Sequence, residues 1–159
     1  MVDVDEVMEK LIEISKRKSD ILNDIYSLTV EQSRIIAKED IEGLNELIDK
    51  KQVFIDEAQN LDYQFEKIVD DLKLVYGVNR LDEIDICRNE VEKIQIVVKA
   101  IMEKVKLIRK LEMENSTLLR EMKDNIERKI TSIKGGKKAV SGYGGYTNMQ
   151  HPVYFDKNN

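Results

Sequence analysis

Hydrophobic residues recur at every third or fourth position along most of this chain, with polar and charged residues between them. The pattern is most regular from Leu81 to Lys134, a stretch without proline or glycine. This spacing draws a single apolar stripe along a helix. We therefore predict one long helix over residues 81–134, with a stripe that contains Ile84, Cys87, Val91, Ile94, Val98, Ile101, Val105 and Ile108.

Two shorter helices are predicted before the long one, over residues 4–38 and 41–76, because apolar residues keep helical spacing in both stretches. Asp3 and Asp40 stand where N-caps are expected, and Gly77 can end the second helix in a left-handed conformation. Short connections place consecutive helices side by side and antiparallel. The sequence therefore predicts an all-α fold.

The expected architecture is an antiparallel three-helix bundle or coiled coil over residues 1–134, with a long third helix that overhangs the bundle. The first two helices are too short to cover the third completely, so an overhang is expected from about Ser116 to Lys134. Its stripe stays apolar, and an apolar helix face without a partner in its own chain usually binds another protein or a second copy. The alternative is that the helix bends and this stripe packs within the bundle or a homodimer. The stripe contains Leu118, Leu119, Met122, Ile126, Ile130 and Ile133.

The composition changes at residue 135, and five of the seven glycines of the chain fall in the segment 135–159. Glycine flexibility without a periodic apolar pattern predicts a disordered tail. The tail also contains tyrosines, among them Tyr143 and Tyr146, and aromatic residues in disordered tails often serve as short docking motifs. A tail without a binding role is the alternative.

Composition and charge restrict the partners that we expect. The content of charged residues is 36%, tryptophan is absent and only one proline occurs, which fits a helical bundle better than a mixed α/β fold. The net charge of −5 argues against nucleic acid and against an anionic membrane surface. The acidic N-terminus is unlike a signal peptide, and no apolar run reaches membrane-spanning length, so we expect a cytoplasmic protein.

Residues for catalysis or cofactor binding are not evident. The sequence contains neither a GxxxxGK[ST] nor a GxGxxG loop, and His151 is the only histidine. Cys87 is the only cysteine, and its place on the apolar stripe predicts a buried residue rather than a reactive thiol. We therefore expect no enzyme activity, no metal and no cofactor.

The chain resembles the FlgN family of flagellar export chaperones along its whole length. The similarity rests on three features: the Lys38-Glu39-Asp40-Ile41-Glu42-Gly43-Leu44 break with the following Leu47-Ile48-Asp49-Lys50-Lys51, the Glu114-Asn115-Ser116-Thr117-Leu118-Leu119 segment, and the tail with Tyr143 and Tyr154-Phe155-Asp156-Lys157.

This resemblance implies a cytoplasmic chaperone that holds hook–filament junction proteins before type III export. It implies that the C-terminal amphipathic helix of the cargo binds at Asn115, Leu118, Leu119, Met122 and Ile126, and the apolar stripe extends this candidate surface to Ile130 and Ile133. Tyr143 or Tyr146 is the match to a tyrosine that helps such chaperones dock on the export gate or ATPase components. A polar residue such as Asn115 on a helical stripe can instead fix register. A chaperone for the filament cap protein or flagellin, and a structural coiled-coil homo-oligomer, are the alternatives.

Overall fold

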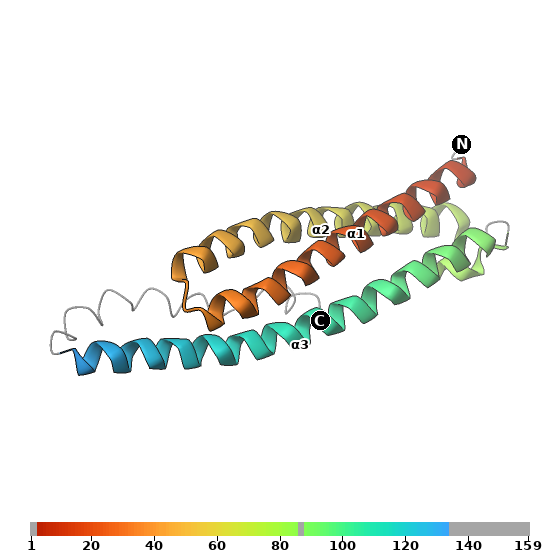
Figure 1. The fold of residues 1–159 in the computed structure, drawn as a ribbon. Helices are drawn as coiled ribbons and strands as arrows, with labels where there is room; N and C mark the ends of the chain where they lie inside the picture. Colours follow the sequence, from red (N-terminus) through yellow and green to blue (C-terminus); the bar gives the residue numbers. More distant parts are fainter. Residues whose placement is uncertain (1–2, 86–87, 134–159) are drawn as a thin grey trace. The chain divides into compact units, whose positions relative to one another are not determined.

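The computed structural model describes residues 3–85 and 88–133 of the chain. Within these ranges every regular element is a helix, and the helices pack against one another, which confirms the predicted all-α bundle. Figure 1 shows the three long helices and the tight connection between the first two. The elements are α1 (Val4–Ala37), α2 (Ile41–Tyr76), the short 3-10 helix η1 (Leu81–Glu83) and α3 (Arg88–Ser132).

Both predicted N-caps are formed by aspartate side chains. Asp3 Oδ1 accepts hydrogen bonds from the backbone N–H groups of Asp5 at 3.1 Å and Glu6 at 3.4 Å. Asp40 Oδ1 accepts one from the N–H of Gly43 at 3.0 Å. A Cβ atom on Gly43 would lie 2.4 Å from Asp40 Oδ2, so glycine lets this carboxylate fold over the first turn of α2. These caps satisfy N–H groups that have no partner inside the helix.

Gly77 ends α2 in the left-handed conformation that the sequence predicted, with a φ of 62°. Its N–H donates to the carbonyl of Leu74, and the N–H of Val78 donates to the carbonyl of Lys73 at 3.1 Å. This pair of hydrogen bonds is the Schellman motif, which satisfies the last carbonyls of a helix.

We expect Gly77→Ala to lower the free energy of unfolding by about 1 kcal/mol, because an L-residue with a Cβ atom is strained at positive φ. No atom lies within 4 Å of the position that this Cβ would take, so the loss has no steric component. Urea unfolding followed by circular dichroism measures the change. Gly77→Asn is the matched control and should lower the free energy of unfolding by less, since asparagine tolerates this conformation. Equal losses in both variants would contradict the explanation.

The predicted start of the third helix at residue 81 was wrong. Leu81–Glu83 forms η1, the backbone of Ile84 is extended with φ −88° and ψ 99°, and α3 begins only at Arg88. Ile84 is nevertheless buried, with 4% of its surface exposed. An isoleucine three residues after Leu81 can therefore reach the core from an extended residue that follows a 3-10 helix as well as from an α-helix. Cys87 lies outside the described residues.

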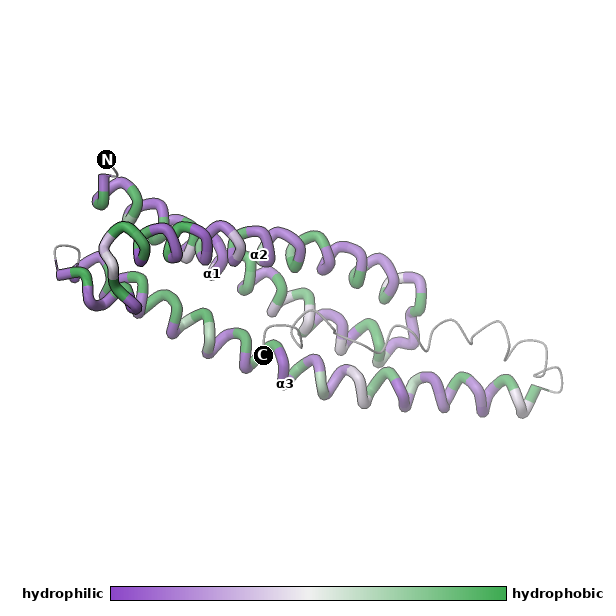
Figure 2. The backbone as a smooth tube through the Cα atoms, turned by 180° about the vertical axis from the view of Figure 1, so that it is seen from behind, coloured by the Kyte–Doolittle hydropathy of each residue, from purple (hydrophilic) through white to green (hydrophobic). Residues whose placement is uncertain are grey.

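The chain consists of two compact units, and each contains parts of all three long helices. Unit 1 comprises Met1–Tyr26 and Lys50–Lys106, and unit 2 comprises Ser27–Asp49 and Leu107–Asn159. The core of unit 1 joins α1, α2, the connection after α2 and the start of α3. Figure 2 shows hydrophobic positions recurring along each helix. One buried cluster of this core consists of Met8, Leu11, Leu72, Ile84, Val91 and Ile94.

Candidate partner-binding surface

Of the seven residues predicted to bind a partner, six lie on the part of α3 that belongs to unit 2, and the seventh, Ile133, directly follows the last residue of α3, Ser132. They differ in exposure. Three are buried, with exposed fractions of 1% for Asn115, 5% for Leu119 and 7% for Met122. Ile126 and Ile130 are half-buried, whereas 37% of Leu118 and 72% of Ile133 are exposed. The apolar stripe is therefore covered in its first part and open at its end.

The overhang of α3 is shorter than the sequence predicted. We expected it to begin near Ser116, but α3 is covered as far as Met122 by residues of α1 and α2. The reason is the late start of α3 at Arg88, which shifts the covered stretch about two turns along the helix. The predicted start of the overhang near Ser116 was therefore wrong.

The end of the α1–α2 hairpin provides the cover. We call residues 35–48 the hairpin tip, which comprises the last residues of α1, the connection and the first two turns of α2. Ile36 and Leu44 of the tip are buried, with exposed fractions of 2% and 1%, and they form one apolar cluster with Leu119 and Met122. Partly buried side chains surround this cluster: Ile35, Ile41, Ile48 and Ile126.

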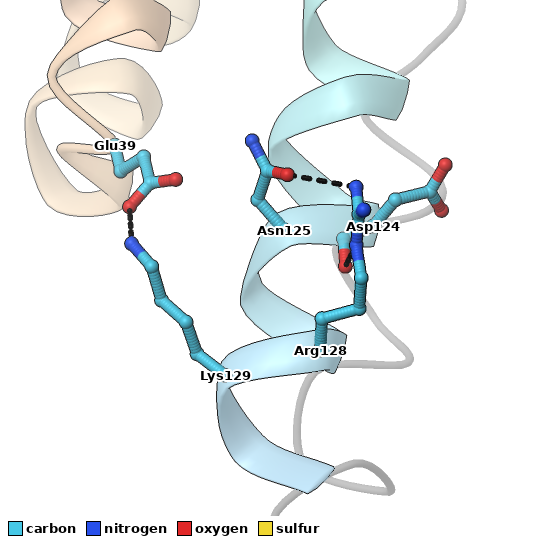
Figure 3. A network of polar contacts seen from close by, with 5 residues as sticks. All are labelled: Glu39, Asp124, Asn125, Arg128 and Lys129. Carbon is cyan, nitrogen blue, oxygen red and sulfur yellow. Dashed lines mark hydrogen bonds and ion pairs between the residues drawn. The ribbon is translucent and has the colours of Figure 1, made fainter. Parts of the chain in front are cut away.

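A second contact joins the connection of the tip to the last turns of α3. Lys129 Nζ donates a hydrogen bond to Glu39 Oε2 at 2.7 Å, and the two side chains form an ion pair (Figure 3). Glu39 has a φ of 55°, a left-handed conformation that favours glycine. The N–H of Glu39 donates to the carbonyl of Ile36 at 3.0 Å, and the N–H of Asp40 donates to the carbonyl of Ile35 at 3.3 Å. α1 therefore also ends in a Schellman motif.

Polar side chains lie next to the apolar cluster inside unit 2. Asn115 Nδ2 donates to the carbonyl of Thr29 at 2.9 Å, and Asn115 Oδ1 accepts a hydrogen bond from Ser33 Oγ at 2.6 Å. Gln32 and Glu112 are also buried, with exposed fractions of 7% and 5%. Asn115 thus ties α3 to α1, which is the geometry of a polar residue that fixes register. We call these five residues the polar layer.

A family model described as FlgN protein matches residues 1–151 of the chain. The chain belongs to the FlgN family. Members of this family are flagellar export chaperones, so the resemblance that the sequence suggested is confirmed at this level. A comparison with curated proteins and one with solved structures gave no match.

Two residues that the family resemblance singled out, Tyr143 and Tyr146, lie outside the described residues. Their predicted contact with the export gate therefore stays a prediction. Within the described part of this FlgN-family chain, the last turns of α3 have a polar flank: Arg128 donates to Asn125 Oδ1 at 2.9 Å and to the backbone carbonyl of Asp124 at 3.4 Å (Figure 3).

A buried lysine of the described chain has a strongly lowered pKa. Lys51, on α2 in unit 1, has only 2% of its surface exposed. Burial disfavours the charged ammonium and lowers the pKa of Lys51 from 10.5 to about 7. Lys51 follows Ile48 by three residues and precedes Ile55 by four, so the helical spacing that marks buried positions also marks this lysine.

Sequence reasoning missed the residues that cover the surface. The Lys38-Glu39-Asp40 break was recognised as a helix boundary with an N-cap and as part of the family resemblance, but its contact with Lys129 depends on long-range packing that spacing does not report. Among the described residues, no group of three or more potential ligands could hold a metal ion. None of the helices described is both long and apolar enough to cross a membrane.

Proposed function

We propose that this FlgN-family chain is a cytoplasmic chaperone for flagellar hook–filament junction proteins. In this proposal it binds their C-terminal amphipathic helix and delivers them to the type III export apparatus. The observation that carries the proposal is the apolar stripe of α3, which continues from Met122 under the hairpin tip to the exposed Ile133. A groove or stripe of this kind accepts a helix through apolar anchors spaced by three and four residues.

The test uses Ile130, which is half-buried, and Ile133, which is exposed. Asp at Leu119 or Met122 would also place a carboxylate in the buried cluster, and the tip would lose its packing. We therefore choose the double variant Ile130→Asp with Ile133→Asp and expect it to weaken binding of a purified junction protein at least tenfold. Loss of two apolar contacts and desolvation of two carboxylates both oppose binding. Isothermal titration calorimetry measures the Kd.

Met113→Asp is the matched control for this experiment. Met113 lies on the same helix with 74% of its surface exposed, and its spacing puts it away from the stripe. The control should bind like the wild type, and circular dichroism should show the same helicity in all three proteins. Unchanged affinity in the double variant would exclude this surface as the binding site.

The identity of the cargo is tested separately by capture from a lysate of the source organism. Recovery of a junction protein supports the proposal, whereas recovery of the filament cap protein or flagellin supports one of the alternative chaperone functions. We also propose that Tyr143 and Tyr146 dock on the export gate or ATPase components. Under this proposal, a chain truncated after Lys134 keeps its cargo and loses that docking.

Self-association through the long helix is the alternative from a different class of function. Several large apolar side chains of α3 are exposed outside the seam that faces α1 and α2, which favours it: Ile96 at 70%, Met102 at 58% and Met113 at 74%. Light scattering distinguishes the two functions. A constant monomer mass over a wide concentration range excludes a structural coiled-coil oligomer.

A further inference from the structure

The hairpin tip occupies the place that a bound helix would need. Leu119 and Met122 lie on the same stripe as Ile130 and Ile133, but the first two are buried, whereas Ile130 is half-buried and Ile133 is exposed. A partner helix of two or more turns that used the whole stripe would meet the tip above Leu119. The tip and such a helix therefore exclude each other.

Among the described residues, the tip is held to α3 by an apolar cluster and an ion pair. The cluster has four buried members, Ile36, Leu44, Leu119 and Met122, with half-buried residues around them, and Leu47 of the tip is also buried. Beyond them the polar layer begins, so this cluster is not continued by an apolar interior at Asn115. A second contact of the tip is the ion pair of Glu39 with Lys129, whose side chains are 29% and 65% exposed. A small cluster bounded by polar residues and an exposed ion pair is a region that can open locally without global unfolding.

We propose that the hairpin tip is an autoinhibitory cover, which occupies the first part of the partner site on α3 and is displaced when a partner helix binds. This inference rests on the proposed function, because it takes the α3 stripe as the partner site. The tip then also indicates the chemistry of the partner. A helix that replaces it offers two aliphatic side chains in place of Ile36 and Leu44, and a carboxylate that pairs with Lys129 in place of Glu39.

Thiol labelling tests whether the tip opens in the free chain. All variants carry Cys87→Ser, so that one introduced cysteine reacts. Met122→Cys reports opening of the tip, and Ile94→Cys, which is 4% exposed in the core of unit 1, is the matched control. We expect N-ethylmaleimide to label Met122→Cys at least tenfold faster than Ile94→Cys under native conditions. Equal rates, set by global unfolding, would overturn the proposal.

Displacement is tested with a purified junction protein as the probe. We expect the probe to slow labelling of Met122→Cys and to speed labelling of Ile36→Cys at least tenfold, because the partner covers α3 and releases the tip. Slower labelling at both positions would mean that the partner binds on top of the tip. That result would contradict the proposal that the tip is an autoinhibitory cover, and it would leave the proposed function intact. A probe that does not bind at all contradicts the proposed function and, with it, the displacement.

Variants that loosen the tip give a further readout. Glu39→Gln removes the ion pair on the side of the tip and leaves Lys129 available to the partner, and Leu44→Ala removes a buried side chain from the cluster. If the tip competes with the partner, both variants should bind the junction protein severalfold more tightly, because a larger fraction of molecules is open. Lys106→Gln, which removes an exposed ion pair within α3, is the control and should not change the Kd. Weaker binding by both tip variants would overturn the proposal.

Discussion

Replacing Lys51 with methionine is expected to raise the free energy of unfolding at pH 7 by roughly 3–5 kcal/mol. The pKa of Lys51 falls from 10.5 to about 7 in the folded chain because burial disfavours its ammonium group. Each unit of that difference corresponds to about 1.4 kcal/mol of stability lost while the lysine is charged in the unfolded chain. Methionine is unbranched and close in length, so it fills the same space without a charge. Urea unfolding at a series of pH values measures the effect.

The pH dependence follows from the direction of the shift. The folded pKa is below the unfolded pKa, so the cost of burying Lys51 is absent above about pH 10.5 and grows as the pH falls. It reaches its full value near pH 7 and stays constant below. The stability gain of Lys51→Met should therefore be largest at and below pH 7 and should vanish near pH 10.5.

Lys50→Met is the matched control, because Lys50 is the neighbouring residue on α2 and is exposed. It makes the same change of charge and should alter stability by no more than about 0.5 kcal/mol at any pH. A gain in Lys50→Met equal to that in Lys51→Met would show that net charge, rather than burial, is responsible. A gain in Lys51→Met that is the same at pH 7 and pH 10 would contradict the lowered pKa.

Local signals predicted the helices well. Asp3, Asp40 and Gly77 act through neighbours within five residues, so the sequence contains all that determines these helix ends. The start of α3 was missed because Leu81 and Ile84 keep helical spacing although Ile84 has an extended backbone. Apolar spacing reports which residues are buried, and a 3-10 helix followed by an extended residue can bury the same residues as an α-helix.

The candidate surface was predicted less completely than the fold. The hairpin tip covers part of this surface, and which part it covers depends on the register of α3 against α1 and α2. The position of Ile36 and Leu44 against Met122 follows from where α3 begins, and an error at that end moved the predicted overhang by about two turns. Lys51 was also overlooked, although it lies on the apolar stripe of α2. A lysine at such a position is normally expected to extend its ammonium group to water, and only the folded chain shows that this one is buried.

Asn115→Asp is expected to destabilise unit 2 by about 3–5 kcal/mol at pH 7. The side chain is 1% exposed, and its Nδ2 donates to the carbonyl of Thr29. An ionised aspartate would direct an oxygen at that carbonyl and leave a negative charge buried without a cation among the hydrogen bonds of Asn115. Ser33 can still donate to the other oxygen, which offsets only part of this cost. Urea unfolding at pH 7 measures the loss.

The loss should shrink as the pH falls, because burial raises the pKa of the new carboxyl group above its unfolded value of about 3.9. A protonated aspartate can donate a hydrogen bond to Thr29 as the asparagine did, so the variant should approach the wild type near pH 4. Asn125→Asp is the control: Asn125 is exposed on the same helix beside Arg128, and a carboxylate there should not destabilise the chain.

This comparison also decides between the two roles that the sequence left open for Asn115. If the amide fixes the register of α3 against α1, Asn115→Asp loses stability without any partner present. If it serves only as a contact for the partner, the free chain keeps its stability and only binding of the junction protein becomes weaker. The hydrogen bonds to Thr29 and Ser33 favour the first outcome, because they are made within unit 2 of the free chain. Full stability of the variant at pH 7 would contradict it.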